Sequence, residues 1–395
     1  MVQFRCMFLK RAAFAASVLI ALPYIQGPVY DYPPEAAFSG SQLLNPYESV
    51  SDPWQRANLH AHGRPWGSLT NGRQSDADIV RAYQSFGYSV AGVSNYQHIA
   101  AAHGVPTIPI YEHGYNVVKR HQLAIGARSV TWFDFPLWQT LSNQQYVINR
   151  VAATADLVAL AHPYSRDAYA LEDLRQLTGY HLIEVVNGPF LFEDSWDAAL
   201  SAGRIVWAVG DDDTHDLTDE RRTAVAWTMI NAPSADTKDV VEALRAGRAY
   251  AVSRTNESAS AIETRLGEVT VREGTLTVSC EGDPSMFIFV GQNGVVKKTV
   301  KNAMSASYTF SHDDSYIRTV IRSPRTAMFL NPVLRHDGSG PAPLAAQVDM
   351  PGTWLFRGGL VLVSVALGLL YRERRRPARQ RSPRAVLAPA DRKTA

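Results

Sequence analysis

The chain of 395 residues contains very little cysteine. Its two cysteines are Cys6 and Cys280, and Cys6 lies in an apolar segment at the N-terminus, so the rest of the chain has a single thiol. This count excludes a disulfide framework and a metal site built from cysteine. It does not decide the compartment, because proteins without disulfides occur on both sides of a bacterial membrane.

Charged residues are also few, at 19%, whereas hydrophobic residues make up 46% of the chain. This composition excludes a wholly disordered protein and leaves room for a large domain with a smaller one beside it. The net charge of +2 comes from the ends: residues 1–11 contribute +3 and residues 372–395 contribute +7, which leaves −8 between them. A mildly acidic middle suits cation binding and argues against a nucleic-acid partner.

The N-terminus has the layout of an export signal. Arg5, Lys10 and Arg11 precede the uninterrupted apolar run AAFAASVLIALPYI at 12–25. Such a basic and then apolar order is typical of secretory signals, but the following residues offer no clear cleavage site of small residues. Residues 1–27 are therefore either a signal peptide or an uncleaved membrane anchor.

A second apolar segment lies near the C-terminus. Residues 355–371 are apolar apart from Arg357 and run directly into the basic segment 372–395. We expect a transmembrane helix over 353–371, short for a full span, with Trp354 and Tyr371 at the interfaces. A buried core helix is the alternative. Basic residues stay on the cytoplasmic side, which predicts an inner- or plasma-membrane protein whose working part is periplasmic or extracytoplasmic.

Between these segments the chain divides into regions of different pattern. Residues 28–53 lack periodicity and fit a tether, whereas 54–252 alternates helical stretches with apolar runs, which predicts an α/β domain built on a parallel sheet or barrel. Residues 258–336 read as strands with an Asn293-Gly294 hairpin turn, so we expect a small β-sandwich-like domain, followed by a linker at 337–352.

Ionisable side chains collect where the apolar runs of the α/β region end. They are His60, His62, Glu112, His121, His162, Asp213 and His215. The carboxyl ends of strands in a parallel barrel open on one face, so these residues can converge although 150 positions separate them. Each signal alone is weak, but several in one domain favour a metal centre.

The residue types narrow the metal and the reaction. Imidazole and carboxylate without thiolate suit Zn, Mn or Fe. Glu112 can bridge two ions, which together would activate a water molecule, so we expect two divalent ions and metal-assisted hydrolysis, with catalytic roles for Glu112, Asp213 and His215.

The order of motifs resembles the polymerase and histidinol phosphatase (PHP) superfamily of metal-dependent phosphoesterases. The motifs are NLHAHG, VAGVSN, a Glu, His121, AHP, EVVNG and GDDDTH, and the resemblance covers about residues 55–250. The segment 258–336 is similar to the C-terminal domain of the carbaryl-hydrolase-like branch of that superfamily.

The resemblance implies a distorted (β/α)7, TIM-like barrel with two or three metals. Carried over by motif, His60, His62, Glu112 and Asp213 would hold the first metal. Glu112, His121 and His162 would hold the second, and His215 a third metal or the substrate.

One motif departs from the family pattern. This chain has Ser94-Asn95-Tyr96 where the family usually has Thr-Asp-His, and the further His expected after His-x-His falls near Ser68. His98 or His103 could substitute, although surface histidines are the simpler interpretation. We therefore expect a binuclear site, in which Tyr96 orients a water molecule or a substrate oxygen.

Other polar residues near these motifs allow two interpretations each. Arg166 could contact a substrate anion or be a solvated loop residue. Asn187 could face the pocket or form a turn, and Asp211 and Asp212 could orient metal ligands or be loop acids. His113 should point away from Glu112 if the strand is regular.

The sequence therefore predicts a membrane-anchored hydrolase that acts on a small-molecule substrate, possibly phosphorylated. A carbamate, amide or ester hydrolase is an alternative, because the same activated water can attack a carbonyl carbon. A non-catalytic binding protein with a degenerate metal site is the alternative from another class.

Overall fold

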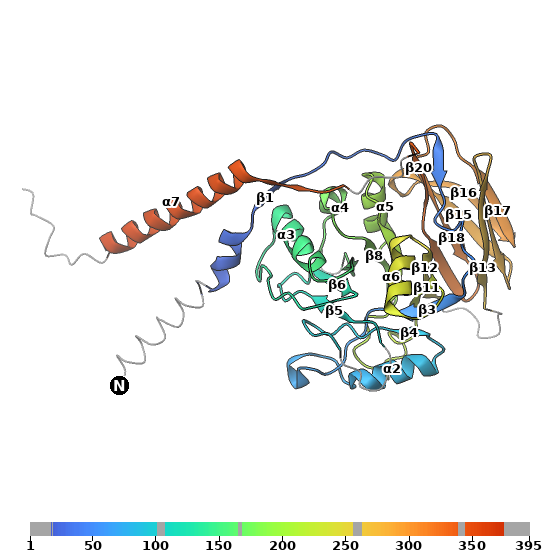
Figure 1. Ribbon diagram of the computed structural model, residues 1–395, viewed down its shortest axis with the longest axis horizontal. Coiled ribbons are helices and arrows are strands. Elements are labelled where there is room, and N and C mark those ends of the chain that lie inside the picture. The colour runs from blue at the N-terminus through green and yellow to red at the C-terminus, as the bar shows by residue number, and fades with distance from the viewer. Residues whose placement is uncertain are drawn as a thin grey trace, which may run out of the picture. The chain divides into compact units, whose positions relative to one another are not determined.

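Short helices and buried strands alternate along the first two-thirds of the chain, as the sequence predicts (Figure 1). The computed structural model describes residues 17, 19–100, 107–164, 168–255, 263–338 and 344–374. Residues up to Val348 form one compact unit, and a second unit begins at Asp349.

The first sheet has six described strands, five of which run in the order β10-β8-β7-β6-β5. They are β5 (Ile110–His113), β6 (His121–Ile125), β7 (Leu157–Ala161), β8 (Leu182–Asn187) and β10 (Trp207–Asp211), and the short β9 (Phe190–Leu191) pairs with β8. The pairs β7–β8 and β8–β10 are parallel, whereas β5–β6 and β6–β7 are antiparallel.

The helices of this region are α2 (Asp76–Ser85), α3 (Leu141–Ala152), α4 (Leu171–Gln176), α5 (Glu193–Ser201) and α6 (Thr237–Arg245). Two of them begin at side-chain caps that stabilise their first turn. The Ser75 hydroxyl accepts the N–H of Asp78, and Thr140 forms a capping box with Asn143. These caps define the start of α2 and of α3.

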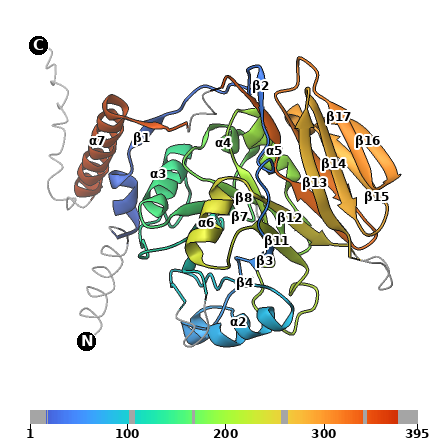
Figure 2. The same ribbon diagram turned by 45° about the vertical axis from the view of Figure 1, so that its right-hand side comes forward.

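A larger sheet runs in the order β16-β15-β18-β19-β12-β11-β3-β4. Its strands are β3 (Trp54–Asn58), β4 (Val90–Ala91), β11 (Ala226–Asn231), β12 (Ala249–Arg254), β15 (Ser285–Val290), β16 (Val296–Ala303), β18 (Tyr316–Arg322) and β19 (Thr326–Leu330). Because β12 pairs with β19, the sheet continues from the α/β region into the β-rich region (Figure 2).

The remaining described strands either extend the larger sheet or form two smaller sheets. β13 (Arg265–Arg272), β14 (Thr275–Glu281) and β17 (Ser305–Thr309) form a three-stranded sheet. β20 (Val333–His336) pairs with β18 and with β2 (Gln42–Leu44), while β1 (Val29–Asp31) pairs with β21 (Gln347–Asp349).

The described residues include two single-turn 3-10 helices, η1 (Gly67–Leu69) and η3 (Gln292–Gly294). The second is the predicted turn, because β15 and β16 pair as an antiparallel hairpin around it. Asn293 and Gly294 both have positive φ, at 57° and 71°. This conformation is the reason for the Asn-Gly pair.

A closed, seven-stranded parallel barrel is not confirmed. The described strands between Trp54 and Arg254 lie in two separate sheets, and β5 and β6 are antiparallel because the connection 114–120 is too short for a crossover helix. Where the two sheets meet, the Thr228 side chain joins them by hydrogen bonds to the backbone of Gly210. The Gly210 N–H donates to the Thr228 hydroxyl, which donates to the Gly210 carbonyl. A Cβ at Gly210 would lie 2.8 Å from the Trp227 carbonyl oxygen, so this approach requires glycine.

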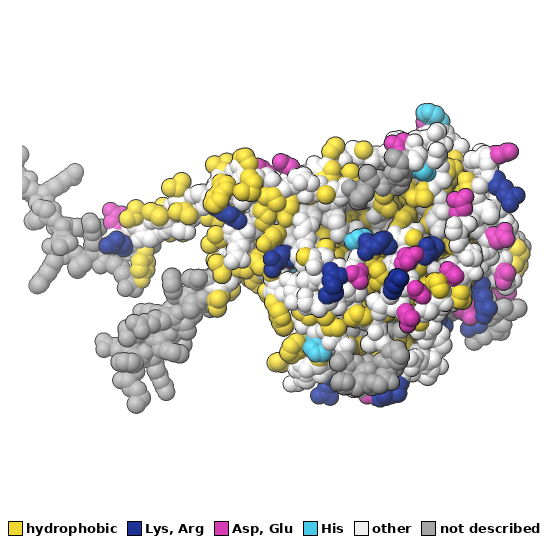
Figure 3. Space-filling model, in the orientation of Figure 1, with side chains coloured by type: hydrophobic (Ala, Val, Ile, Leu, Met, Phe, Trp, Pro, Cys, Tyr) yellow, Lys and Arg dark blue, Asp and Glu magenta, His cyan; other side chains and the backbone are white. Residues whose placement is uncertain are grey.

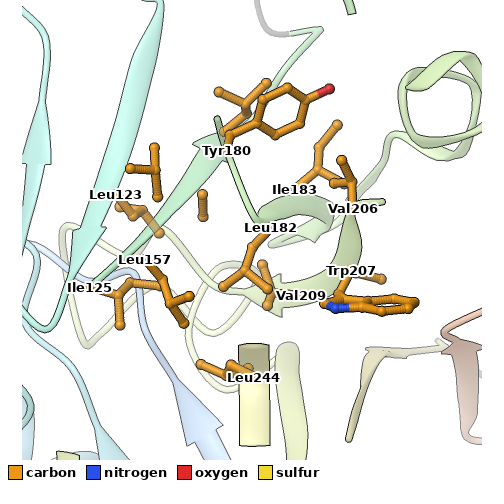
Figure 4. Packing of buried hydrophobic residues seen from close by; sticks show 14 of the residues in the cluster. Leu123, Ile125, Leu157, Tyr180, Leu182, Ile183, Val206, Trp207, Val209 and Leu244 are labelled. Atoms are coloured by element: carbon orange, nitrogen blue, oxygen red, sulfur yellow. The ribbon is translucent and has the colours of Figure 1, made fainter. Parts of the chain in front are cut away.

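The core of the α/β region lies between these sheets and the helices. Figure 4 shows Leu123, Leu157, Leu182 and Val209 from four successive strands pointing into one cluster. Each is fully buried, which stabilises the fold by roughly 1.5–3 kcal/mol per side chain. This packed core fixes the strand ends that carry the ionisable residues.

The second unit contains a single described helix, α7 (Met350–Arg374). Of the described residues, only the stretch Met350–Glu373 is a helix long and apolar enough to cross a membrane, with a mean hydropathy of 1.8. It is longer than the 353–371 expected, because Met350 and Pro351 already belong to its first turn. The guanidinium of Arg357 lies 5.3 Å from the Trp354 ring centroid, so this cation is partly screened within the helix.

Candidate metal centre

The ionisable residues singled out in the sequence lie at the ends of five strands. His60 and His62 follow β3, Glu112 belongs to β5, His121 begins β6, His162 follows β7, and Asp213 and His215 follow β10. The backbone turns sharply at two of these ends, since His162 and Asp213 have positive φ of 30° and 51°. This turn directs both side chains into the shared cluster.

Glu112 lies at the centre of the cluster. Its Oε1 is 2.6 Å from Nδ1 of His121 and 3.1 Å from Nε2 of His162. Its Oε2 is 3.2 Å from Nε2 of His62. The two oxygens of one buried carboxylate therefore face two groups of imidazoles, as a bridging ligand would.

Asp213 completes the group around the His-x-His motif. Its Oδ1 lies 3.3 Å from Nε2 of His60 and 3.2 Å from Nε2 of His62, and those two nitrogens are 3.1 Å apart. Two imidazole nitrogens this close cannot both carry a proton without conflict. A shared cation between them and the carboxylates would remove the conflict.

Unpartnered atoms support this interpretation. Glu112 Oε2 and Asp213 Oδ1 are buried without a hydrogen-bond partner, although imidazole nitrogens lie nearby. Burying a carboxylate oxygen without a partner costs free energy of folding unless a cation binds it. Four groups of three residues place one ligand atom each within 4.8 Å of one another: His60, His162 and Asp213; His60, His62 and Glu112; His62, Asp213 and His215; Glu112, His121 and His162. The residues present thus fit divalent metal ions.

Electrostatics point the same way. Burial lowers the pKa of His60, but the charges of Asp213, Glu184 and Glu112 outweigh burial and raise it well above its usual value. Burial raises the pKa of Glu112, yet the neighbouring His121 and His60 hold it well below its usual range. The buried carboxylates give the site a negative electrostatic potential, which attracts positive charge in the form of protons or metal ions.

His215 and Tyr96 form the more accessible side of the cluster. The side chains of Asp213 and His215 are 16% and 23% exposed, whereas Glu112 is fully buried. Nδ1 of His215 donates to the Asp213 carbonyl at 2.9 Å, and its Nε2 lies 3.3 Å from the Tyr96 hydroxyl. Burial and the neighbouring His62 lower the pKa of His215 to about 4, so its Nε2 is an unprotonated acceptor near neutral pH.

Asn95 and Tyr96 lie at the positions where the PHP pattern usually has Asp and His. The Tyr96 ring stacks on His62 with 4.4 Å between centroids. The Asn95 side chain accepts the Gly63 N–H at 2.6 Å and donates to Asp76 at 2.9 Å, so it holds loops together and does not face the cluster. His98 belongs to none of the candidate ligand groups, and its ring contacts Trp66.

Sequence reasoning missed Glu184, in the middle of β8. Its Oε1 accepts from Nδ1 of His60 at 2.6 Å, and its Oε2 accepts the backbone N–H of His162 at 2.6 Å. The one available signal was a single carboxylate inside the apolar run LIEVVN, which a fully buried strand tolerates only with partners.

Glu184 also explains Asn187, whose side-chain N–H donates to Glu184 Oε2 at 2.9 Å. Asp211 accepts the Leu59 N–H, and Asp212 accepts three backbone N–H groups from residues 224–226 and the Tyr83 hydroxyl. These two acids fix the backbone around the cluster.

Of three further predictions, one falls on a described residue. His113 points away from Glu112, as expected, and its ring nitrogens contact Gln122 and the Phe133 carbonyl. Arg166 and His103 lie outside the described residues.

Comparisons with known proteins give a limited answer. No protein-family model matches the sequence, and no curated protein matches it. Among solved structures, the chain is similar to a two-domain protein from Bacteroides vulgatus that contains a predicted PHP-like metal-dependent phosphoesterase. The identity is 14%, the match covers 80% of this chain and 99% of that one, and the TM-score is 0.40. The carbaryl-hydrolase-like branch stays a prediction.

Proposed function

We propose that this protein is a metal-dependent hydrolase of phosphate esters, anchored in a membrane with residues up to Val348 on the extracytoplasmic side. The observation that supports the proposal best is Glu112, whose two buried oxygens face separate imidazole groups at 2.6–3.2 Å. Such a carboxylate suits a pair of divalent ions. The helix Met350–Glu373 and the basic residues that follow it support the anchorage.

The roles of the residues follow from their places in the cluster. His60, His62, Glu112 and Asp213 would hold one ion, and Glu112, His121 and His162 the other. Bound ions would activate a water molecule and neutralise charge that develops on the phosphoryl group.

His215 and Tyr96 lie on the accessible side, where a substrate enters. Nε2 of His215 can accept a proton, and the Tyr96 hydroxyl, 3.3 Å away, can donate one to a substrate oxygen. Burial together with the negative charges of Glu112 and Asp213 raises the pKa of Tyr96, which keeps this hydroxyl protonated.

The test uses the full chain purified in detergent. Metal content per chain is measured by mass spectrometry for wild type, His60→Ala and Asp213→Ala, with His312→Ala as a matched control because His312 is an exposed histidine. We expect close to two ions per chain in wild type and in the control, and fewer in the two site variants.

Substrate class is tested on the same samples. Aryl phosphate monoesters and diesters are compared with aryl carbamates and carboxylic esters. Hydrolysis of phosphate esters that is lost in both site variants supports the proposal. Preferential hydrolysis of carbamates would replace it by the carbonyl-directed alternative, and a folded wild type without metal would favour a binding protein.

A further inference from the structure

Large apolar side chains are exposed around one side of the metal centre. We call this group the aromatic collar: Trp66, Leu69, Tyr115, Val117, Trp132 and Trp138. Trp132 and Trp138 are 60% and 66% exposed, and Leu69 is 87% exposed. Exposed apolar groups of this size usually mark an interaction surface.

The collar is continuous although its members come from three loops. The rings of Trp66 and Trp132 lie 6.1 Å apart, edge to face. The Tyr115 hydroxyl donates to the Trp132 carbonyl at 3.0 Å, and the Val117 N–H donates to the Pro136 carbonyl at 3.1 Å. These contacts hold the loops 114–120 and 132–138 together as one surface.

The collar adjoins the accessible side of the metal centre. The Trp66 indole donates to the Tyr96 carbonyl at 2.8 Å, and the Tyr96 side chain contacts His215. The loop 114–120 connects Glu112 to His121, so its exposed Tyr115 and Val117 lie beside the cluster. The collar therefore lies next to the Tyr96 side of the cluster.

The other end of the collar meets the N-terminal apolar segment. The Tyr24 hydroxyl accepts the Leu137 N–H and donates to the Trp138 carbonyl, both at 3.0 Å, and the Tyr24 ring packs against Trp138. Gly27 packs so closely on Phe135 that a Cβ would lie 2.8 Å from its ring. Residues 24–27 are thus built into the fold, which favours retention of this segment as an anchor.

The segment just before Tyr24 is helical and exposes its apolar side chains. Leu19, Ile20 and Leu22 are exposed on residues 19–26, the short blue helix of Figure 1. In Figure 3 yellow side chains gather on the part of the surface beside this helix. The N-terminal apolar run therefore adjoins the aromatic collar, and its composition suits the interior of a membrane.

We propose that the aromatic collar docks on the lipid bilayer and that, given the proposed function, the substrate is a phosphorylated amphiphile taken from that bilayer. Trp and Tyr are the residues that prefer the membrane interface, because each combines an apolar ring with a polar group. Basic side chains accompany the collar: Arg64 is exposed, and the Lys119 ammonium lies 5.8 Å from the Tyr96 ring centroid. Such cations attract anionic headgroups.

The docking is tested by fluorescence, independently of activity. The full chain is reconstituted in vesicles of phosphatidylcholine and phosphatidylglycerol, with and without bromine on the acyl chains, which quenches nearby tryptophans. We expect the quenched fraction to fall about two-fold in the double variant Trp132→Phe/Trp138→Phe. Val296→Trp is the matched control, because Val296 is an equally exposed apolar residue on β16, and its added fluorescence should escape quenching.

Unchanged quenching in the double variant, or equal quenching of the Val296→Trp probe, overturns the docking. Circular dichroism of each variant confirms that it is folded. Substituting two exposed rings by smaller ones leaves the core intact, so loss of folding is not expected.

The substrate class is tested with phosphatidic acid in the same vesicles and with soluble glycerol 3-phosphate. We expect the ratio of the lipid rate to the soluble rate to fall about five-fold in the double variant. A ratio that does not change overturns the amphiphile assignment. If the collar is quenched but the metal-loaded chain hydrolyses neither compound nor any aryl phosphate, the proposed function fails and the docking stands.

Discussion

Glu184 accepts a hydrogen bond from Nδ1 of His60 at 2.6 Å, and both side chains are fully buried. The bond places the His60 proton on Nδ1 and leaves Nε2 directed at Glu112 and Asp213. A carboxylate in this position fixes the tautomer and the orientation of a metal-binding imidazole. Glu184 also accepts the His162 N–H, so one carboxylate positions residues of both candidate ligand groups.

The first prediction concerns this carboxylate. Glu184→Gln should weaken metal binding by about ten- to hundred-fold, because the amide is a poorer acceptor for the His60 and His162 N–H groups. Titration calorimetry with Mn²⁺ measures the effect on the full chain. Glu268→Gln, an exposed carboxylate on β13, is the control and should bind as wild type does. Equal affinity in the two variants would contradict a positioning role.

The second prediction separates the role of Tyr96 from that of the candidate metal ligands. Tyr96→Phe removes the hydroxyl 3.3 Å from His215 Nε2 but keeps the ring stacked on His62. We expect the metal content to stay at the wild-type value and kcat to fall by about ten-fold, the worth of one hydrogen bond in the transition state. Steady-state kinetics on an aryl phosphate, with metal analysis of the same sample, measures both. A loss of metal would make Tyr96 a structural neighbour of the ligands.

The third prediction concerns metal removal. Because ions that bind the folded state stabilise it, a chelator should lower the melting temperature by several degrees, equivalent to about 2.7 kcal/mol at a metal concentration of 100 times Kd. Differential scanning fluorimetry with and without chelator measures the shift. His60→Ala keeps the second candidate ligand group, so its shift should be smaller than that of wild type, whereas His312→Ala should respond as wild type does. A wild type insensitive to chelator would argue against structural coupling of the site.

The candidate ligands at strand ends were accessible to sequence reasoning, because a His or Asp directly after an apolar run is visible without any knowledge of pairing. His60, His162 and Asp213 were found in this way, and the structure brings them within reach of one another. The orientation of His113 away from Glu112 followed from strand alternation. The Asn293-Gly294 hairpin followed from the backbone conformation that those residues favour.

Two strand pairings were not accessible from the sequence. The short connection 114–120 makes β5 and β6 antiparallel, and β12 pairs with β19, whose first residue, Thr326, comes 72 positions after Arg254 at the end of β12. Neither pairing leaves a periodicity in the sequence. Glu184 was missed for a related reason. Its carboxylate is stabilised by N–H groups of His60 and His162, which follow other strands, so only the folded arrangement shows why a carboxylate lies in that apolar run.

The fourth prediction concerns pH and a histidine outside the metal centre. Burial and the neighbouring Arg245 lower the pKa of His181 from 6.5 to about 4. Between pH 6.5 and about 4 the unfolded chain binds a proton at this residue and the folded chain does not. The free energy of unfolding should therefore fall as the pH drops through this window, by at most about 1.4 kcal/mol per pH unit.

Urea unfolding of wild type and His181→Gln at pH 7 and at pH 4.5 tests this. The variant should lose less stability on acidification than wild type. His312→Gln, at an exposed position, should retain the full pH dependence. Identical pH dependence in wild type and His181→Gln would show that His181 is protonated in the folded chain.

The last prediction concerns the junction between the β-rich region and α5. Arg318 on β18 is 3% exposed and donates to Asp197 from Nε at 2.8 Å and from Nη2 at 2.6 Å, while its Nη1 donates to Glu193. Both acids belong to α5. Arg318→Met leaves the buried Asp197 without its cation, so we expect a loss of about 3–5 kcal/mol. The double variant Arg318→Met/Asp197→Asn should recover part of it, because the unpaired charge is gone.

Arg322→Met is the control: Arg322 lies on the same strand, is about half exposed and reaches Glu193 only at 3.9 Å, so it should cost less than about 1 kcal/mol. Guanidinium unfolding of the four proteins measures these differences, and equal losses for Arg318→Met and Arg322→Met would show that this buried pair does not hold the two regions together.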